Sequence, residues 1–186
     1  MPLIRETIVV TSDAAGVPHI APLGLIAEGG HWIIAPFRPS TTLDNLRARP
    51  VAVANLTDDA RVFAGCLTGR RDWPLVATAP GFPPRLAQAL AHWELEVVET
   101  LEDAQRPRFI CRVARTEAHA AYEGFNRAFA AVVEAAVLAS RLDFLPHAEI
   151  EAEFARLKIT VGKTAGAREA EAFSWLEAKV AAHGAI

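Results

Sequence analysis

Hydrophobic residues follow two different periods along this 186-residue chain. In roughly the first 115 residues they form short runs or alternate with polar residues, and turns rich in glycine and proline separate the runs, which predicts β-strands. In roughly the last 70 residues they recur every three or four positions, which is typical of amphipathic helices. Strands followed by helices predict an α+β chain with two domains, residues 1–118 and 119–186.

The first part predicts short strands with two helices inserted between them. The expected strands cover residues 4–11, 19–26, 31–35, 51–56, 75–77, 92–100 and 109–113, and the expected helices cover residues 40–49 and about 60–67. So many short strands, with only short helices between them, indicate a small antiparallel β-barrel. In the second part, the apolar period over residues 125–139, 150–161 and 173–180 predicts three helices that pack together.

Composition excludes several classes of function. Hydrophobic residues make up 52% of the chain, enough for a packed core, and the formal net charge of −3 provides no basic surface for nucleic acid. Charged residues such as Arg127 and Glu134 interrupt the most apolar segment, so it is not expected to span a membrane. The first residues lack the apolar run of a signal peptide, and Cys66 and Cys111 form no CxxC pair. We therefore expect a cytoplasmic protein without structural disulfides.

Single residues give little support for metal or nucleophilic chemistry. The six histidines show no HxH or HxxxH spacing, so no metal site is predicted. Cys66 has apolar neighbours and is interpreted as inert core. Glu94, Glu96 and Glu99 offer acid–base chemistry, but Glu94 and Glu96 alternate with apolar residues and are interpreted as the solvated face of a strand.

Arg38 and three hydroxyl residues, Ser40, Thr41 and Thr42, stand where the first predicted helix begins. A helix start offers unpaired N–H groups and the positive end of the helix dipole, and both favour a bound phosphate. Arg38 adds a guanidinium that can bind phosphate oxygens in bidentate fashion. The alternative is capping, because hydroxyls satisfy helix N–H groups and Thr41 with Asp44 has capping-box spacing. The pattern alone leaves both interpretations open.

Two further segments offer hydrogen-bonding groups or open backbone. Asn55, Thr57 and Asp58 stand at the end of a buried strand, where they either border a site or cap the next helix. Gly24 lacks a side chain, so a flat ring can approach the backbone around it, or else the glycine marks a β-bulge. The loop over residues 68–85 is a candidate for selecting a substrate.

Several motifs occur in a recognisable order. They are Glu6-Thr7-Ile8, Pro18-x-x-Ala21-Pro22-Leu23-Gly24, Pro36-Phe37-Arg38-x-Ser40-x-Thr42-Leu43-x-Asn45-Leu46 and Asn55-x-Thr57-Asp58-Asp59. This order resembles the FMN-binding split-barrel superfamily, which includes flavin reductases, flavoredoxin and pyridoxamine-phosphate oxidase. The chain is similar in particular to an archaeal and methylotroph branch that carries a helical C-terminal domain, whose first helix resembles Phe125-Asn126-Arg127-Ala128 and the residues that follow.

The resemblance implies a Greek-key, antiparallel FMN-binding split β-barrel followed by a small three-helix C-terminal domain. It also implies which residues surround the cofactor. The FMN phosphate would be bound by Arg38, Ser40, Thr41, Thr42 and Asn45. The flavin ring would lie against Pro22, Leu23, Gly24 and Leu25, and Asn55, Thr57 and Asp58 would border the site.

The implied function is an FMN-dependent oxidoreductase linked to tetrahydromethanopterin-dependent one-carbon metabolism. No catalytic residue is carried over, because hydride transfer is the flavin's own reaction. A non-catalytic flavin-binding or assembly protein, or a split barrel that uses a deazaflavin or pyridoxal phosphate, stays open as an alternative. Because split-barrel flavoproteins usually complete their sites with a second subunit, we expect a homodimer with the flavin near the interface.

Overall fold

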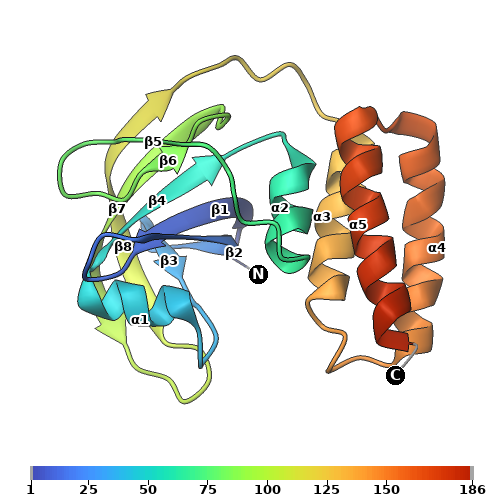
Figure 1. Ribbon diagram of the computed structural model, residues 1–186. Coiled ribbons are helices and arrows are strands. Elements are labelled where there is room, and N and C mark those ends of the chain that lie inside the picture. Colours follow the sequence, from blue (N-terminus) through green and yellow to red (C-terminus); the bar gives the residue numbers. More distant parts are fainter. Residues whose placement is uncertain (1, 185–186) are drawn as a thin grey trace. The chain divides into compact units, whose positions relative to one another are not determined.

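The computed structural model describes residues 2–184, which fold into two compact units (Figure 1). The first unit runs to Thr57 and resumes over Trp73–Ala121. The second unit takes the intervening Asp58–Asp72 and the chain from Tyr122 onward. The predicted class, a barrel with C-terminal helices, is confirmed. A single boundary at residue 118 does not describe the division, because a helix from the middle of the chain packs with the C-terminal ones.

Six antiparallel strands close the barrel in the order β1-β2-β3-β8-β7-β4. They are β1 (Ile4–Ser12), β2 (Pro18–Glu28), β3 (His31–Ile34), β4 (Val51–Leu56), β7 (Ala91–Leu101) and β8 (Arg108–Ala118). A separate two-stranded sheet pairs β5 (Leu75–Val76) with β6 (Arg85–Leu86). The sequence did not predict β6, because two residues are too few to show a period.

Alternate side chains of the barrel strands point into one core. The buried members of this core are Val9, Leu25, Ile34, Leu43, Leu46, Ala52, Ala54, Leu95, Phe109 and Cys111. Leu43 and Leu46 come from α1 (Thr41–Ala48), so the apolar side of this helix is part of the barrel core. Burial of these two leucines fixes the helix, and with it the polar residues at its N-terminal end.

The barrel is split along one line. β8 pairs with β3 only over residues 109–111, and β2 pairs with β3 only over residues 26–28. Within residues 2–184, the remainder of β8 therefore pairs with β7 alone, and the remainder of β2 pairs with β1 alone. Each of these two strands keeps one edge whose N–H and C=O groups have no strand partner.

Gly24 lies in the regular part of this sheet. The pairing of β1 with β2 runs without interruption from Ile4 opposite Ile26 to Ser12 opposite Pro18. The alternative that Gly24 marks a β-bulge is therefore wrong. The register shifts of the barrel lie instead in the pairing of β7 with β8.

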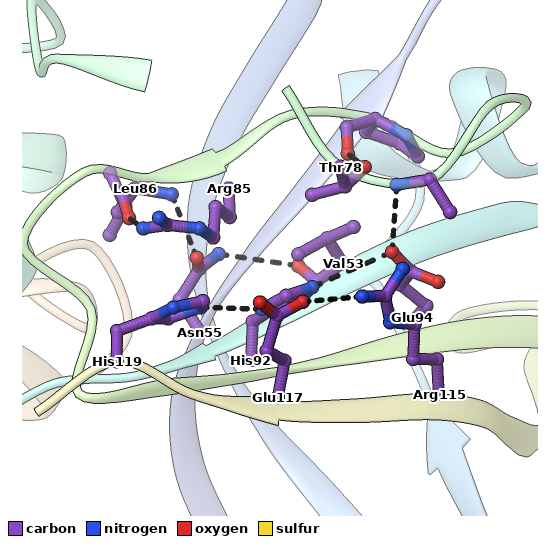
Figure 2. Close-up of polar contacts among 12 residues, drawn as sticks. Val53, Asn55, Thr78, Arg85, Leu86, His92, Glu94, Arg115, Glu117 and His119 are labelled. Atoms are coloured by element: carbon purple, nitrogen blue, oxygen red, sulfur yellow. Dashed lines mark hydrogen bonds and ion pairs between the residues drawn. The ribbon is translucent and has the colours of Figure 1, made fainter. Parts of the chain in front are cut away.

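The segment that contains β5 and β6 covers the outer face of β4 and β7. Asn55 of β4 is 0% exposed and Glu94 of β7 is 1% exposed, although both alternate with core-facing residues. The N–H of Leu86 donates to Asn55 Oδ1 at 2.8 Å, and the N–H of Ala79 donates to Glu94 Oε1 at 2.9 Å (Figure 2). The expectation that Glu94 belongs to a solvated face is wrong, because this segment replaces the solvent there. Glu96 remains partly exposed.

Four helices form the second unit: α2 (Ala60–Leu67), α3 (Arg127–Ala139), α4 (His147–Thr164) and α5 (Ala167–Gly184). Phe63 of α2 meets Phe129 of α3 edge to face, with ring centroids 5.9 Å apart. Phe154 of α4 packs against Phe173 of α5 at 5.6 Å. Among the helices of residues 2–184, none combines the length and hydropathy that a membrane span requires.

Candidate cofactor-binding site

Ser40 caps the N-terminus of α1. Its backbone is extended (φ −160°, ψ 147°), and its Oγ accepts a hydrogen bond from the N–H of Leu43 at 3.3 Å. The expected capping box of Thr41 and Asp44 does not form, because Thr41 is already the first helical residue. The motif therefore does cap the helix, with Ser40 as the capping residue.

Capping leaves the donors of this helix end available. A hydroxyl can accept and donate at the same time, so Ser40 can accept from the Leu43 N–H and still donate its own O–H. Thr41 is exposed. The first N–H groups of a helix have no acceptor within the helix. The end of α1 thus presents donors at the positive end of the helix dipole, a combination that fits a phosphate group.

Arg38 lies just before this helix end and is held by the loop between β7 and β8. Its Nε donates to the carbonyl of Asp103 at 3.0 Å, and its guanidinium pairs with Glu102. Glu102 also pairs with Arg47 of α1 at 3.0 Å, so one carboxylate joins two arginines. The Glu102 side chain is 61% exposed, and such exposed pairs contribute little stability. A phosphate can therefore replace Glu102 on Arg38 at small cost.

The loop that holds Arg38 is itself ordered by a carboxylate. The N–H groups of Arg106 and Gln105 donate to Asp103 Oδ1 at 2.7 Å and 2.8 Å. These hydrogen bonds, that of Arg106 first, lower the pKa of the Asp103 carboxyl below its ordinary value. The turn therefore keeps an ionised carboxylate at its centre and presents the Asp103 carbonyl to Arg38.

Thr42 and Asn45, the other two expected phosphate residues, lie on the buried side of α1. They are 4% and 3% exposed. The amide of Asn45 donates to Thr11 Oγ1 of β1 at 3.0 Å. This bond positions the helix on the barrel, and a direct contact of either side chain with a phosphate stays a prediction.

The residues expected against the flavin ring divide between the two faces of β2. Leu23 packs against the barrel core and Leu25 is fully buried in it, so only their backbone is available to a ligand. Pro22 and Gly24 alternate with them on the outer face. A Cβ at Gly24 would lie 2.7 Å from Ile4 Cγ2 and 3.1 Å from Glu6 Oε1. The missing side chain therefore makes room for side chains of β1, which a ring on this face would meet.

The three residues expected at the border of the site have different environments. Asn55 is fully buried, and its amide donates to the carbonyl of Ile8 at 2.9 Å while its Oδ1 accepts from the Leu86 N–H. Asn55 therefore ties β4 to β1 and β6. Thr57 is partly buried at the end of the first unit, and Asp58 is exposed at the start of the second. Asp59, rather than any of these three, caps α2.

A row of paired residues crosses the barrel wall at Asn55. Pro22 lies opposite Ile8, Ile8 opposite Asn55, and Asn55 opposite His92. The fifth strand of the row, β8, places Glu117 opposite His92. The outer face that carries Pro22 therefore continues to His92.

His92 belongs to a polar cluster that sequence reasoning missed (Figure 2). His92 is 1% exposed, and its Nδ1 lies 2.9 Å from Nε2 of His119, whose ring is nearly parallel to it at 7°. On its other side, His92 Nε2 lies 3.5 Å from Glu94 Oε1. The sequence could have indicated that His92 and Glu94 are neighbours, because residues two positions apart on a strand lie on the same face. His119 was not, because its place depends on the register shifts of β7 and β8.

Burial decides the protonation of several groups. Burial lowers the pKa of His119 below its ordinary 6.5, and the charges of Arg85 and His92 lower it further. Burial also raises the pKa of Cys66 to about 11 and that of Cys111 to about 12, so neither thiol is a nucleophile near neutral pH. The described residues contain no group of three His, Cys, Asp or Glu side chains that could hold a metal ion.

Two family models match the chain. Residues 5–120 match the model described as "Protein of unknown function (DUF447) N-terminal domain", and residues 126–178 match the model "Protein of unknown function (DUF447)". The two matches cover both the barrel and the C-terminal helices. No curated protein sequence matches the chain.

Solved structures with a similar fold include an FMN-bound protein and a flavoredoxin. The chain is similar to an FMN-bound DUF447 protein from Methanosarcina mazei, with 20% identity, 96% coverage of both chains and a TM-score of 0.81. It is also similar to 2-nitrobenzoate 2-nitroreductase from Pseudomonas fluorescens (19% identity, 64% of this chain and 66% of that chain, TM-score 0.52). A third similar structure is flavoredoxin from Methanosarcina acetivorans (15% identity, 64% and 69%, TM-score 0.51). These likenesses establish the split-barrel fold that the motifs indicated.

Proposed function

We propose that this chain, which belongs to the DUF447 protein family, binds FMN and acts as a flavin-dependent oxidoreductase. One observation carries the proposal: the N-terminal end of α1 gathers the Arg38 guanidinium, the Ser40 and Thr41 hydroxyls and the first N–H groups of the helix. All of these are hydrogen-bond donors, and the strongest of them is charged. A phosphate monoester is the ligand that such a set of donors suits best.

Different residues bind the phosphate and the ring of FMN. Arg38, Ser40 and Thr41 hold the phosphate once Glu102 moves from Arg38 to Arg47, its second partner. The outer face of β2, with Pro22 and Gly24, offers the surface for the ring. FMN supplies electron and hydride transfer when bound, so the protein's part is to bind, orient and shield it.

The comparisons support this proposal at the level of the family. A DUF447 protein whose fold matches over 96% of both chains is FMN-bound, and the other similar structures include a nitroreductase and a flavoredoxin. A link to tetrahydromethanopterin-dependent one-carbon metabolism stays a prediction.

The absorbance spectrum of the purified protein, before and after denaturation, tests the proposal. We expect a flavin spectrum, and FMN rather than FAD in the released fraction. The sequence has one segment suited to binding a phosphate, and it has no glycine-rich loop of the kind that binds the pyrophosphate of FAD. A pyridoxal or deazaflavin spectrum, or a colourless protein that binds no added FMN, would refute FMN binding.

Oxidation of reduced nicotinamide by the holoprotein tests oxidoreductase activity. If the holoprotein contains flavin but reduced nicotinamide does not reduce it, the result would favour a non-catalytic flavin-binding protein.

We also propose that the protein is a homodimer with the flavin near the interface. Within residues 2–184, the parts of β2 and β8 that pair with a single neighbouring strand support this, because the edge of a sheet is a surface on which another chain can pair. Val98 and Val113 on β7 and β8 are exposed apolar side chains that a second subunit could cover. Light scattering of the holoprotein at micromolar concentration should give the dimer mass, and a monomer mass would refute the dimer.

A further inference from the structure

The arrangement of Glu94, His92 and His119 favours one assignment of protons to the two imidazole rings. Glu94 Oε1 accepts from the Ala79 N–H, so it is an acceptor toward His92 as well. His92 therefore carries its proton at Nε2, the atom that faces Glu94, and keeps a lone pair at Nδ1. His119 must then donate its Nε2–H to His92 Nδ1 across the 2.9 Å contact, which leaves a lone pair at His119 Nδ1.

Hydrogen bonds within the described residues do not satisfy every buried polar atom of this cluster. The distance of 3.5 Å between His92 Nε2 and Glu94 Oε1 is too long for a good hydrogen bond, and Nε2 has no hydrogen-bond partner among the described residues. Buried polar groups are normally satisfied, so an unsatisfied one requires an explanation. A positive charge on His92 would strengthen its attraction to the Glu94 carboxylate, so that Nε2 and Oε1 could approach to hydrogen-bond distance.

We propose that Glu94, His92 and His119 form a proton relay that loads when the cofactor site becomes negatively charged. His119 takes up a proton at Nδ1 and passes its Nε2 proton to His92 Nδ1. The positive charge then rests on His92, beside the Glu94 carboxylate. One proton enters, one moves between the rings, and no other bond is made or broken. His92 and Glu94 are positioning residues in this account, and His119, which is partly exposed, exchanges the proton.

The relay's link to redox chemistry rests on the proposed FMN function. Two-electron reduction adds negative charge to a bound flavin. His92 lies three strands from Pro22 in the row that crosses the barrel wall, a separation of about 14 Å at the usual strand spacing. At that distance, one negative charge raises the proton affinity of the relay on the order of tenfold.

Other charges around the relay set its resting state. Arg85 on β6 opposes a proton on His119, whereas Glu117 on β8 favours one. Arg115 pairs with Glu117 at 2.8 Å and weakens its effect. The two imidazoles share a hydrogen bond, so they titrate as a pair, and a second proton is opposed by the first. Burial and the charge of Arg85 therefore oppose a proton on His119 until the site gains negative charge.

NMR of the flavin-free protein tests the relay independently of FMN binding. A ¹⁵N–¹⁵N coupling across the hydrogen bond should join His92 Nδ1 and His119 Nε2. Glu94→Gln should lower the first apparent pKa of the pair, because the charge on His92 loses its carboxylate partner. Glu96→Gln, two residues along the same face and partly exposed, is the matched control and should leave that pKa unchanged. A missing coupling, or equal effects of the two variants, would overturn the relay.

The midpoint potential of bound FMN, measured against pH, tests the redox link. In the pH range where the pair titrates, the wild type should take up as much as about half a proton more per two electrons than His119→Gln does, the most that a tenfold change in proton affinity gives. Identical pH dependence in the two proteins, with both binding FMN, would refute the link while leaving FMN binding in place. Absence of FMN binding in calorimetry would refute the proposed function and the redox link together, but it would not affect the NMR result.

Discussion

The carboxylate of Glu102 joins Arg38, just before α1, to Arg47 in the last turn of α1. This pairing places a negative charge at the proposed position of the phosphate. Glu102→Gln should therefore strengthen FMN binding, by up to about fivefold, since an exposed pair is worth at most about 1 kcal/mol. Isothermal titration calorimetry of the flavin-free protein measures the change.

Glu28 provides the matched control for Glu102. It also pairs with an arginine, Arg108, and its side chain is similarly exposed at 57%. Glu28→Gln removes the same charge away from α1 and should leave FMN affinity unchanged. Weaker binding in Glu102→Gln, or an equal gain in both variants, would contradict the competition between Glu102 and phosphate.

Arg38→Ala should weaken FMN binding ten- to hundredfold. A charge-assisted hydrogen bond contributes about 1.5–3 kcal/mol, which corresponds to this range of affinity. Arg38 is partly exposed, so the melting temperature of the flavin-free protein should change little. Arg108→Ala is the control, and equal affinity of Arg38→Ala and the wild type would count against the phosphate grip.

Ser40→Asp separates capping from phosphate binding. Asp caps helices as well as Ser does, so the free energy of unfolding without flavin should stay within about 0.5 kcal/mol of the wild type. The same change removes a donor and adds a negative charge, so FMN affinity should fall at least about tenfold. A variant that is stable and still binds FMN normally would show that Ser40 is a cap and nothing more.

The pattern of apolar positions predicted the barrel and the C-terminal helices because both depend on local periods. It also located α1 and the polar residues at its start, since hydroxyls, arginine and a following apolar stripe are all local signals. The roles of Asn45 and Asn55 were not predictable in this way. Their partners, Thr11, Ile8 and Leu86, come from strands that only the sheet register brings close.

The burial of Glu94 is a second feature that the local pattern of residues could not predict. Its alternation with apolar residues is correct, yet the face it lies on is covered by a segment with almost no regular structure. Similarly, α2 belongs with the C-terminal helices because of contacts such as Phe63 with Phe129, which no local period encodes.

The lowered pKa of His119 predicts a loss of stability in acid. The unfolded chain binds a proton at this residue around the ordinary value of 6.5, whereas the folded protein binds it only at lower pH. The contribution of His119 is therefore fully present above 6.5 and is lost as the pH falls below it. His119→Gln should show a shallower decline of the unfolding free energy between about pH 6.5 and 5. Chemical denaturation at several pH values measures this.

His31, in the turn region between β2 and β3, serves as the control for that experiment. The same measurement on His31→Gln shows how far replacing a histidine elsewhere on the barrel changes this decline. If His119→Gln and the wild type decline in parallel, the environment assigned to His119 is wrong.

Calorimetric titration of the flavin-free protein with FMN and with riboflavin isolates the contribution of the phosphate, because the two ligands differ only by that group. We predict saturable binding of FMN and at least about tenfold weaker binding of riboflavin, with that difference largely lost in Arg38→Ala. Equal affinities for FMN and riboflavin, or no saturable binding of FMN, would contradict the assignment of the α1 end as a phosphate site.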